Sequence, residues 1–180
     1  MKVICISGKA RHGKDTLAGI LKEHLEDRGY RVLIAHFGDL VKYVCEKFFD
    51  WNGEKDEAGR TLLQYVGTDV VRTQEPDFWT NFIKSILTLF NGEWDYVLIP
   101  DCRFPNEIEC FKNGDFDASL VRINRPNFNS GLTEQQLAHP SETALDDYKA
   151  DCYVLNDSSL ADLENKVSEI LEIIGGHNAK

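Results

Sequence analysis

The chain has 180 residues, with 20 Lys and Arg against 30 Asp and Glu, which gives a formal net charge of −10 at pH 7. With 42% hydrophobic residues it can bury a real core, so a disordered chain, a collagen and a small disulfide scaffold are excluded. The negative charge also argues against a protein that coats nucleic acid or an anionic membrane, because either partner would be repelled over most of the surface. A few concentrated positive groups must therefore hold any anionic ligand.

The sequence shows no pattern typical of export, membrane insertion or structural zinc. The apolar run at residues 3–7 is too short for a signal-peptide core, and no later stretch approaches the ~18 apolar residues of a membrane span. The five cysteines are scattered and show no Cys-x-x-Cys pair or Cys/His ligand spacing. The expectation is a cytoplasmic protein with reduced thiols.

The first half of the chain alternates predicted strands and helices. Its apolar patterns predict, in order, a strand over 3–7, a helix over 14–27, a strand over 31–37 and a helix that begins at Asp39 as N-cap and carries Phe48 on its apolar side. A polar loop follows at 52–59. Further helical segments are expected over 60–72, which Gly67 could interrupt, and from Pro76 in a first turn to about residue 90.

The second half predicts strands at 96–100, 119–124 and 152–155, a helix over 105–112 and a last helix from Ser158 or Ser159 to residue 174. Five apolar strands separated by helices indicate one α/β domain over 1–180: a three-layer sandwich with a five-stranded, mostly parallel sheet and helices on both faces. The weakly periodic linker at 126–147 is long enough to serve as a lid.

A glycine-rich motif lies between the first predicted strand and the first predicted helix. It reads Gly8, Lys9, Ala10, Arg11, His12, Gly13, Lys14, Asp15, Thr16. This Gly-x4-Gly-Lys pattern stands at the strand-to-helix turn where a phosphate-binding loop requires it. Backbone N–H groups and the positive helix end bind phosphate oxygens there, and the lysine reaches the β- and γ-phosphates. The alternative is a glycine-rich turn that binds nothing.

Asp15 stands directly after the lysine, where Ser or Thr is usual, and Thr16 follows one place later. Either residue could hold Mg²⁺, directly or through water. Alternatively, Asp15 is an acid favoured by the dipole at the helix N-terminus.

Asp101 directly follows the predicted strand at 96–100, on the sheet edge that carries the glycine-rich motif. An Asp at this place holds Mg²⁺ in P-loop enzymes. Arg103 would face the same crevice and could bind a phosphate. The alternative is that Asp101 caps the helix that begins at Pro105 and that Arg103 is a surface residue.

Together these motifs resemble the deoxynucleoside monophosphate kinases of the bacteriophage type, within the P-loop kinase superfamily. The resemblance runs in order over nearly the whole chain. Its segments are Gly8 to Thr16, Arg60-x3-Gln64-x2-Gly67-Thr68-Asp69, Trp79, Pro100-Asp101-x-Arg103, Arg125-Pro126, His139-x-Ser141-Glu142 and Asn156-Asp157. Larger relatives carry an inserted subdomain after the second strand, where this chain has only the loop at 52–59.

The resemblance implies transfer of the γ-phosphoryl group of ATP to a deoxynucleoside 5′-monophosphate, with ATP and Mg²⁺ as cofactors. It implies that Lys14 and the loop amides bind ATP, with Asp101 on the metal. Arg11 would contact the γ-phosphate or the acceptor phosphate. A helical segment at about 39–91 would bind the monophosphate, and a lid-like segment at about 126–147 would follow the lid arginine Arg125. The acceptor residues of the helical segment would be Arg60, Gln64 and Asp69.

Several of these residues have a second interpretation. His139 and Glu142 could position a substrate or hold the lid closed, or Ser141 could cap a short helix with His139 in a loop. Trp79 could stack on a base or belong to the core. Arg122 has a weaker family match and could be an ordinary surface arginine.

Two other functions stay open at this point. A phosphomevalonate-type kinase shares the Gly-Lys-Asp loop and the Asp-x-Arg sequence, and a regulatory module could bind nucleotide without transferring phosphate. The expected partners are the two small-molecule substrates, without nucleic acid or membrane. A homodimer is also left open.

Overall fold

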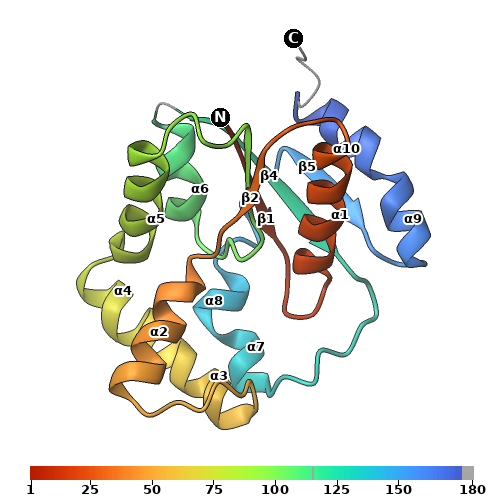
Figure 1. Ribbon diagram of the computed structural model, residues 1–180. Coiled ribbons are helices and arrows are strands. Elements are labelled where there is room, and N and C mark those ends of the chain that lie inside the picture. Colours follow the sequence, from red (N-terminus) through yellow and green to blue (C-terminus); the bar gives the residue numbers. More distant parts are fainter. Residues whose placement is uncertain (115, 176–180) are drawn as a thin grey trace.

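The structure is a computed structural model that describes residues 1–114 and 116–175 (Figure 1). Within these ranges, five strands form one sheet in the order β2-β3-β1-β4-β5, and every neighbouring pair is parallel. The strands are β1 (Lys2–Ser7), β2 (Val32–Ile34), β3 (Tyr96–Ile99), β4 (Asp117–Asn124) and β5 (Cys152–Leu155). The predicted α/β sandwich is confirmed.

Helices cover both faces of the sheet because successive strand residues point to opposite sides. Ile4 and Ile6 of β1 join one apolar cluster, under α1 (Lys14–Glu26), α9 (Leu160–Asn165) and α10 (Val167–Ile173). Val3 and Cys5 join the other, under α5 (Phe78–Leu89) and α6 (Pro105–Lys112). Burial on both faces explains the continuous apolar runs of the inner strands.

The remaining helices gather beyond the carboxyl ends of the strands, at the lower edge of the sheet in Figure 1. They are α2 (Gly38–Phe48), α3 (Glu57–Gln64), the π-helix η1 (Tyr65–Val70), α4 (Val71–Gln74), α7 (Glu134–Ala138) and α8 (Pro140–Thr143). A third apolar cluster of Val41, Cys45, Val66 and Trp79 joins α2, η1 and α5. This arrangement surrounds the edge on which the glycine-rich motif lies.

The predicted strand at 31–37 was too long. β2 pairs only with β3 and ends at Ile34, because it is an edge strand. The prediction that Asp39 caps the next helix was also wrong. The N-cap of α2 is Phe37, and Asp39 lies inside the first turn, where its carboxylate pairs with Lys42 at 2.6 Å. Phe48, expected on the apolar face, is 73% exposed.

Other predicted boundaries shifted by smaller amounts. The polar loop ends early, since Asp56 caps α3 by accepting a hydrogen bond from the Gly59 N–H. Gly67 does not interrupt the helical segment but lies within η1. Pro76 precedes α5 instead of lying in its first turn, and the last helix divides at Lys166. The linker at 126–147 contains α7 and α8.

No helix in the described ranges is both long enough and apolar enough to cross a bilayer.

Candidate active site

The glycine-rich motif forms a tight loop between β1 and α1. Gly8 and Gly13 have positive φ angles of 150° and 98°. A Cβ at Gly8 would lie 2.3 Å from the Ile123 carbonyl oxygen, and one at Gly13 would lie 2.7 Å from Nδ2 of Asn156. Only glycine fits either place, so β4 and the residues after β5 close over the outer side of the loop.

Lys14 lies across the inside of this loop. Its ammonium group donates to the carbonyl oxygens of Gly8 and Lys9, each at 2.8 Å. Burial, together with the charge of Arg103, lowers the pKa of Lys14 to about 8. An anion beside Lys14 would favour the charged form of its side chain.

The outer side of the loop is held by residues that follow β4 and β5. The backbone N–H of Arg125 donates to Nδ1 of His12 at 3.1 Å, and Nδ2 of Asn156 donates to the His12 carbonyl at 3.0 Å. The Arg125 guanidinium lies over the ring of Phe128, 4.2 Å from its centroid. In this structure Arg125 therefore supports the loop from outside.

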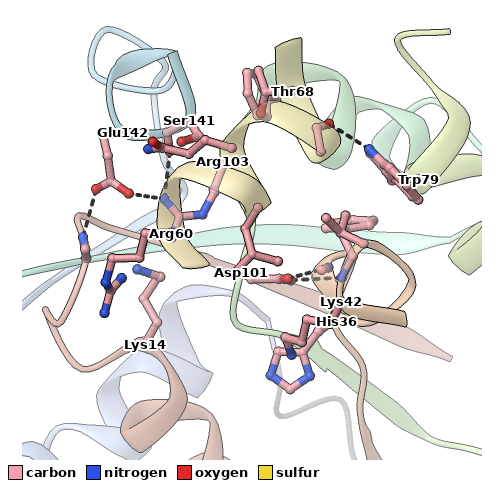
Figure 2. Close-up of a pocket in the computed structure, with 18 of the residues that line it drawn as sticks. Lys14, His36, Lys42, Arg60, Thr68, Trp79, Asp101, Arg103, Ser141 and Glu142 are labelled. Atoms are coloured by element: carbon pink, nitrogen blue, oxygen red, sulfur yellow. Dashed lines mark hydrogen bonds and ion pairs between the residues drawn. The ribbon is translucent and has the colours of Figure 1, made fainter. Parts of the chain in front are cut away.

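A cavity of about 380 Å³ opens beside Lys14, between the loop, the end of β3, the helices α2 to η1 and the segment α7–α8 (Figure 2). Seven Lys and Arg side chains and four carboxylates line it. The basic residues are Arg11, Lys14, Lys42, Lys55, Arg60, Arg72 and Arg103. The acidic ones are Asp15, Asp101, Glu107 and Glu142. A protein with a net charge of −10 thus concentrates positive charge at one place.

Lys55 and Arg60 differ from the other basic residues of the cavity, because within the described part of the chain neither side chain forms a hydrogen bond or an ion pair. Arg11 and Lys14 also lack an ion pair, but they donate to backbone carbonyl oxygens. Burial lowers the pKa of both side chains, and neighbouring positive charges lower it further: Lys42 for Lys55, and Arg11 for Arg60. Lys55 and Arg60 thus lie among like charges without a carboxylate bonded to either, an arrangement that favours an anionic ligand.

Asp101 reaches the N-terminus of α2. Its carboxylate accepts hydrogen bonds from the backbone N–H groups of Phe37 at 3.1 Å and Gly38 at 2.8 Å. The alternative that Asp101 caps the helix at Pro105 is wrong, because Glu107 caps that helix. The Glu107 carboxylate accepts from the N–H groups of Arg103 at 2.6 Å and Phe104 at 3.0 Å.

Asp15 lines the cavity and Thr16 is exposed outside it. The carboxylate of Asp15 lies 3.2 Å from Nε2 of His36, which raises the pKa of His36 and lowers that of Asp15. Both Asp15 and Asp101 lie close enough to Lys14 to raise its pKa.

The carboxylates of Asp15 and Asp101 fit an Mg²⁺ ion that binds together with a nucleotide. Mg²⁺ in phosphoryl-transfer sites uses one or two carboxylates together with phosphate oxygens and water. Asp15 and Asp101 supply two carboxylates beside the glycine-rich loop. In residues 1–114 and 116–175, no group of three or more His, Cys, Asp or Glu side chains surrounds a metal position. The site therefore lacks a cage for a resident ion.

The segment at 126–147 contacts the glycine-rich loop through several side chains. Arg11 donates to the Ser130 carbonyl at 2.7 Å, and Lys9 pairs with Asp146 at 2.5 Å. Oε2 of Glu142 accepts from the backbone N–H of Ala10 at 2.9 Å. The segment at 126–147 thus lies against the loop, and its role as a lid stays a prediction.

His139 joins this segment to η1. Its Nδ1 accepts from the Ser141 N–H at 3.2 Å, which places the ring hydrogen on Nε2, and Nε2 lies 3.2 Å from the carboxylate of Asp69. The alternative in which Ser141 caps α8 is wrong, since the N-cap is His139. Neither His139 nor Asp69 lines the cavity.

Trp79 belongs to the core, which is one of the two roles expected from the sequence. It is 2% exposed, and its indole N–H donates to the Gly67 carbonyl inside η1 at 2.8 Å. Its edge still borders the cavity. Arg122 is not an ordinary surface arginine, because it donates to Ser7 Oγ and to the carbonyls of Leu145 and Asp146.

The structure brings most of the predicted site residues to one cavity. The large cavity is lined by Ala10, Arg11, Lys14, Asp15, Arg60, Gln64, Trp79, Asp101, Arg103 and Glu142. Gly8, Lys9 and His12 line a smaller cavity of about 170 Å³. Gly13, Thr16, Asp69, Arg125 and His139 line neither of these two.

Sequence reasoning missed Arg72, Glu107, Lys42 and Lys55. Arg72 and Glu107 form a buried ion pair, and the Arg72 guanidinium lies 4.1 Å from the centroid of the Phe104 ring. One signal for Glu107 was available, because an acid two residues after Pro105 is typical of the first turn of a capped helix. Nothing local marks the other three.

Comparison with known proteins decides the family. Residues 39–167, well over half of the chain, match the sequence model of the family described as deoxynucleotide monophosphate kinase. The chain belongs to the deoxynucleotide monophosphate kinase family. The predicted resemblance is thereby confirmed.

Several viral proteins are similar to this chain. It is 35% identical to protein ORF77 of Ictalurid herpesvirus 1 over 113 residues, which is 62% of the chain and 47% of that protein. It is 29% identical to the deoxynucleotide monophosphate kinase of Enterobacteria phage T4 over 125 residues, 68% of the chain and 49% of the phage protein. It is 30% identical to the deoxynucleotide monophosphate kinase of Escherichia phage RB69 over 165 residues, which is 88% of the chain and 65% of the phage protein. The chain spans about half the length of the first two relatives.

Solved structures share the fold of this family member. The APS kinase CysC of Mycobacterium tuberculosis, in complex with AMPPNP and APS, superposes with a TM-score of 0.52 at 10% identity, over 97% of each chain. The structure of APE1195 gives a TM-score of 0.52 at 14% identity, over 98% of this chain and 96% of that one. At such identities the likeness concerns the fold alone.

Proposed function

We propose that the protein transfers the γ-phosphoryl group of ATP to a deoxynucleoside 5′-monophosphate, giving ADP and the deoxynucleoside diphosphate. One observation carries this proposal: a single cavity joins the phosphate loop around Lys14 to the unpaired cations Lys55 and Arg60. A donor and an acceptor that both carry phosphate need positive charge at both ends of one site. Family membership supports a nucleotide acceptor.

On the donor side, the amides of the loop and Lys14 bind the β- and γ-phosphates of ATP. Asp101 and Asp15 are the residues that would hold Mg²⁺, which when bound screens the phosphate charges and orients the transferred group. His36 fixes the carboxylate of Asp15 by direct contact. The backbone N–H groups of Phe37 and Gly38 fix the carboxylate of Asp101 by donating hydrogen bonds to it.

On the acceptor side, the helical segment at about 39–91 supplies Arg60 and Lys55 for the monophosphate. Gln64 and the edge of Trp79 border the part of the cavity that would receive the base. Asp69, which pairs with His139, would link this segment to the lid-like segment and not contact the substrate.

The transfer needs alignment more than covalent help from the protein. An oxygen of the acceptor phosphate, already deprotonated near neutral pH, attacks the γ-phosphorus in line with the β–γ bridging oxygen, whose bond to phosphorus breaks as ADP leaves. Lys14 and Arg103, which both line the cavity, would stabilise the negative charge on the transferred group. The closed segment at 126–147 limits access of water, which would otherwise hydrolyse ATP.

The test is a coupled assay of ADP release with ATP, Mg²⁺ and a panel of dAMP, dGMP, dCMP, dTMP, AMP and phosphomevalonate. The proposal requires turnover with at least one deoxynucleotide and loss of most of that turnover in Lys14→Ala, with the fold retained by circular dichroism. Turnover with phosphomevalonate alone, or with no acceptor, would refute it.

A further inference from the structure

Glu142 is a buried carboxylate among the basic side chains of the large cavity. Its side chain is 4% exposed, although it lines the cavity that contains Lys14, Arg60 and Arg103 (Figure 2). A site complementary to anionic ligands would bind them more strongly without a carboxylate in its wall. The placement of Glu142 close to the phosphate loop therefore calls for an explanation.

Both oxygens of Glu142 are already bound to the protein. Oε2 accepts from the backbone N–H of Ala10 at 2.9 Å, and Oε1 forms an ion pair with the guanidinium of Arg103. An ionised carboxylate would repel a substrate phosphate at this place. Direct binding of substrate is thus the less favourable role for Glu142, and its contacts point to Arg103.

Arg103 depends on these contacts for its orientation. Glu142 and the Ser141 carbonyl, at 2.8 Å, hold its guanidinium from the side of α8, and Glu107 fixes its backbone N–H. Lys14 and Arg60 are near enough for the charge of Arg103 to lower the pKa of each. Without a compensating anion, repulsion by Lys14 and Arg60 would therefore turn the flexible side chain of Arg103 toward solvent.

We propose that Glu142 is a positioning residue for phosphoryl transfer. It holds the guanidinium of Arg103 toward the cavity against repulsion by Lys14 and Arg60, and through Ala10 it makes this orientation depend on closure of the 126–147 segment over the phosphate loop. The inference rests on the proposed kinase activity. It assigns Glu142 to Arg103 and not to a substrate.

A double-mutant cycle tests this assignment. Glu142→Gln keeps the shape of the side chain and removes its charge, and Arg103→Ala removes the group that it orients. We expect Glu142→Gln to lower kcat by roughly 10- to 100-fold, as a misplaced catalytic group does, with the KM for ATP and for the deoxynucleotide changed less than about threefold. In the Arg103→Ala background, Glu142→Gln should cause no further loss.

Glu134→Gln is the matched control. It also replaces a carboxylate of the same segment by an amide, but Glu134 is exposed at the start of α7, lines neither of the two cavities and forms no side-chain hydrogen bond or ion pair among the described residues. It should reduce kcat by less than about threefold. Glu142→Asp, which keeps the charge with a shorter reach, should recover part of the activity and serves in the cycle if Glu142→Gln does not fold.

Two results would overturn the proposal while leaving the kinase activity intact. One is a loss from Glu142→Gln that multiplies with the loss from Arg103→Ala, which would show independent action. The other is a raised KM for the deoxynucleotide at unchanged kcat, which would make Glu142 a substrate ligand. Absence of activity in the unmodified protein would instead refute the proposed function, and the inference with it.

Discussion

Arg72 and Glu107 show at the scale of single residues how the site is supported. The side chains are 11% and 2% exposed, and the pair lies at the wall of the cavity. The Glu107 carboxylate also accepts from the N–H groups of Arg103 and Phe104, so one acid fixes the start of α6 and the backbone of Arg103. Burial raises the pKa of Glu107 to about 7 despite the neighbouring Arg72.

Loss of Arg72 should therefore destabilise the protein in a pH-dependent way. Folding raises the pKa of Glu107 from 4.5 to about 7. The protonated carboxyl group therefore contributes to the stability of the folded state at low pH, and this contribution is lost as pH rises through about 7. Arg72→Met leaves that charge buried and unpaired at pH 8, which should cost about 3 kcal/mol, and clearly less at pH 5.

Urea unfolding at the two pH values measures this difference. Arg31→Met is the control, since Arg31 pairs with Asp95 on the surface and its loss should have a small effect that does not change between pH 5 and 8. Equal destabilisation by Arg72→Met at both pH values would contradict the buried-charge account.

Lys55 is the second residue whose role can be isolated. As a cation without an ion-pair partner in the described ranges, it should contribute to binding of the acceptor phosphate. Lys55→Gln should raise the KM for the deoxynucleotide by about tenfold, equivalent to about 1.4 kcal/mol, with little change in the KM for ATP. Lys47→Gln, which removes an exposed lysine of α2 outside the cavity, should change neither constant. A matching rise in the KM for ATP would move Lys55 to the donor side.

At the scale of elements, the π-helix η1 is the most unusual feature of the helical segment at about 39–91, which we propose binds the acceptor. It sits between α3 and α4, and its Gly67 carbonyl accepts from the indole N–H of Trp79. A Cβ on Gly67 would come within 3.2 Å of Cγ1 of Val41, so α2 packs closely on this turn. The bulge thereby sets the position of the residues around it, Gln64 and Thr68 at the cavity and Asp69 opposite His139.

Removal of the Trp79 hydrogen bond should loosen this element. Trp79→Phe leaves the buried Gly67 carbonyl without its donor and should lower the free energy of unfolding by about 1–3 kcal/mol beyond the packing loss. Trp94→Phe is the matched control, because the same atoms are removed from an indole that makes no hydrogen bond among the described residues. Chemical denaturation of both variants compares the losses. Equal losses would show that the hydrogen bond is unimportant.

At the scale of the whole molecule, the inner strands were readable from the sequence because burial on both faces leaves an unbroken apolar run. The edge strand β2 was overestimated, since only one neighbour supports it. The cap of α2 was misassigned because its acceptor, Asp101, lies more than 60 residues along the chain. Contacts between distant segments carry no local signal.

The same distinction applies to the site. The phosphate loop is a local motif, so Gly8, Gly13 and Lys14 could be placed from spacing alone. The pairs Arg72–Glu107, His139–Asp69 and Arg103–Glu142 each join distant segments, and only the fold shows them. The net charge of −10 is also explained only at this scale, because the fold brings seven Lys and Arg side chains of an acidic protein to one cavity.

The most direct test of this account is the product balance of one reaction. ATP, Mg²⁺ and a deoxynucleoside monophosphate that supports turnover are incubated with the protein, and all nucleotides and free phosphate are quantified by chromatography. The account predicts ADP and the deoxynucleoside diphosphate in equal amounts, with little free phosphate. ADP accompanied by an equal amount of free phosphate, with the monophosphate unchanged, would contradict it.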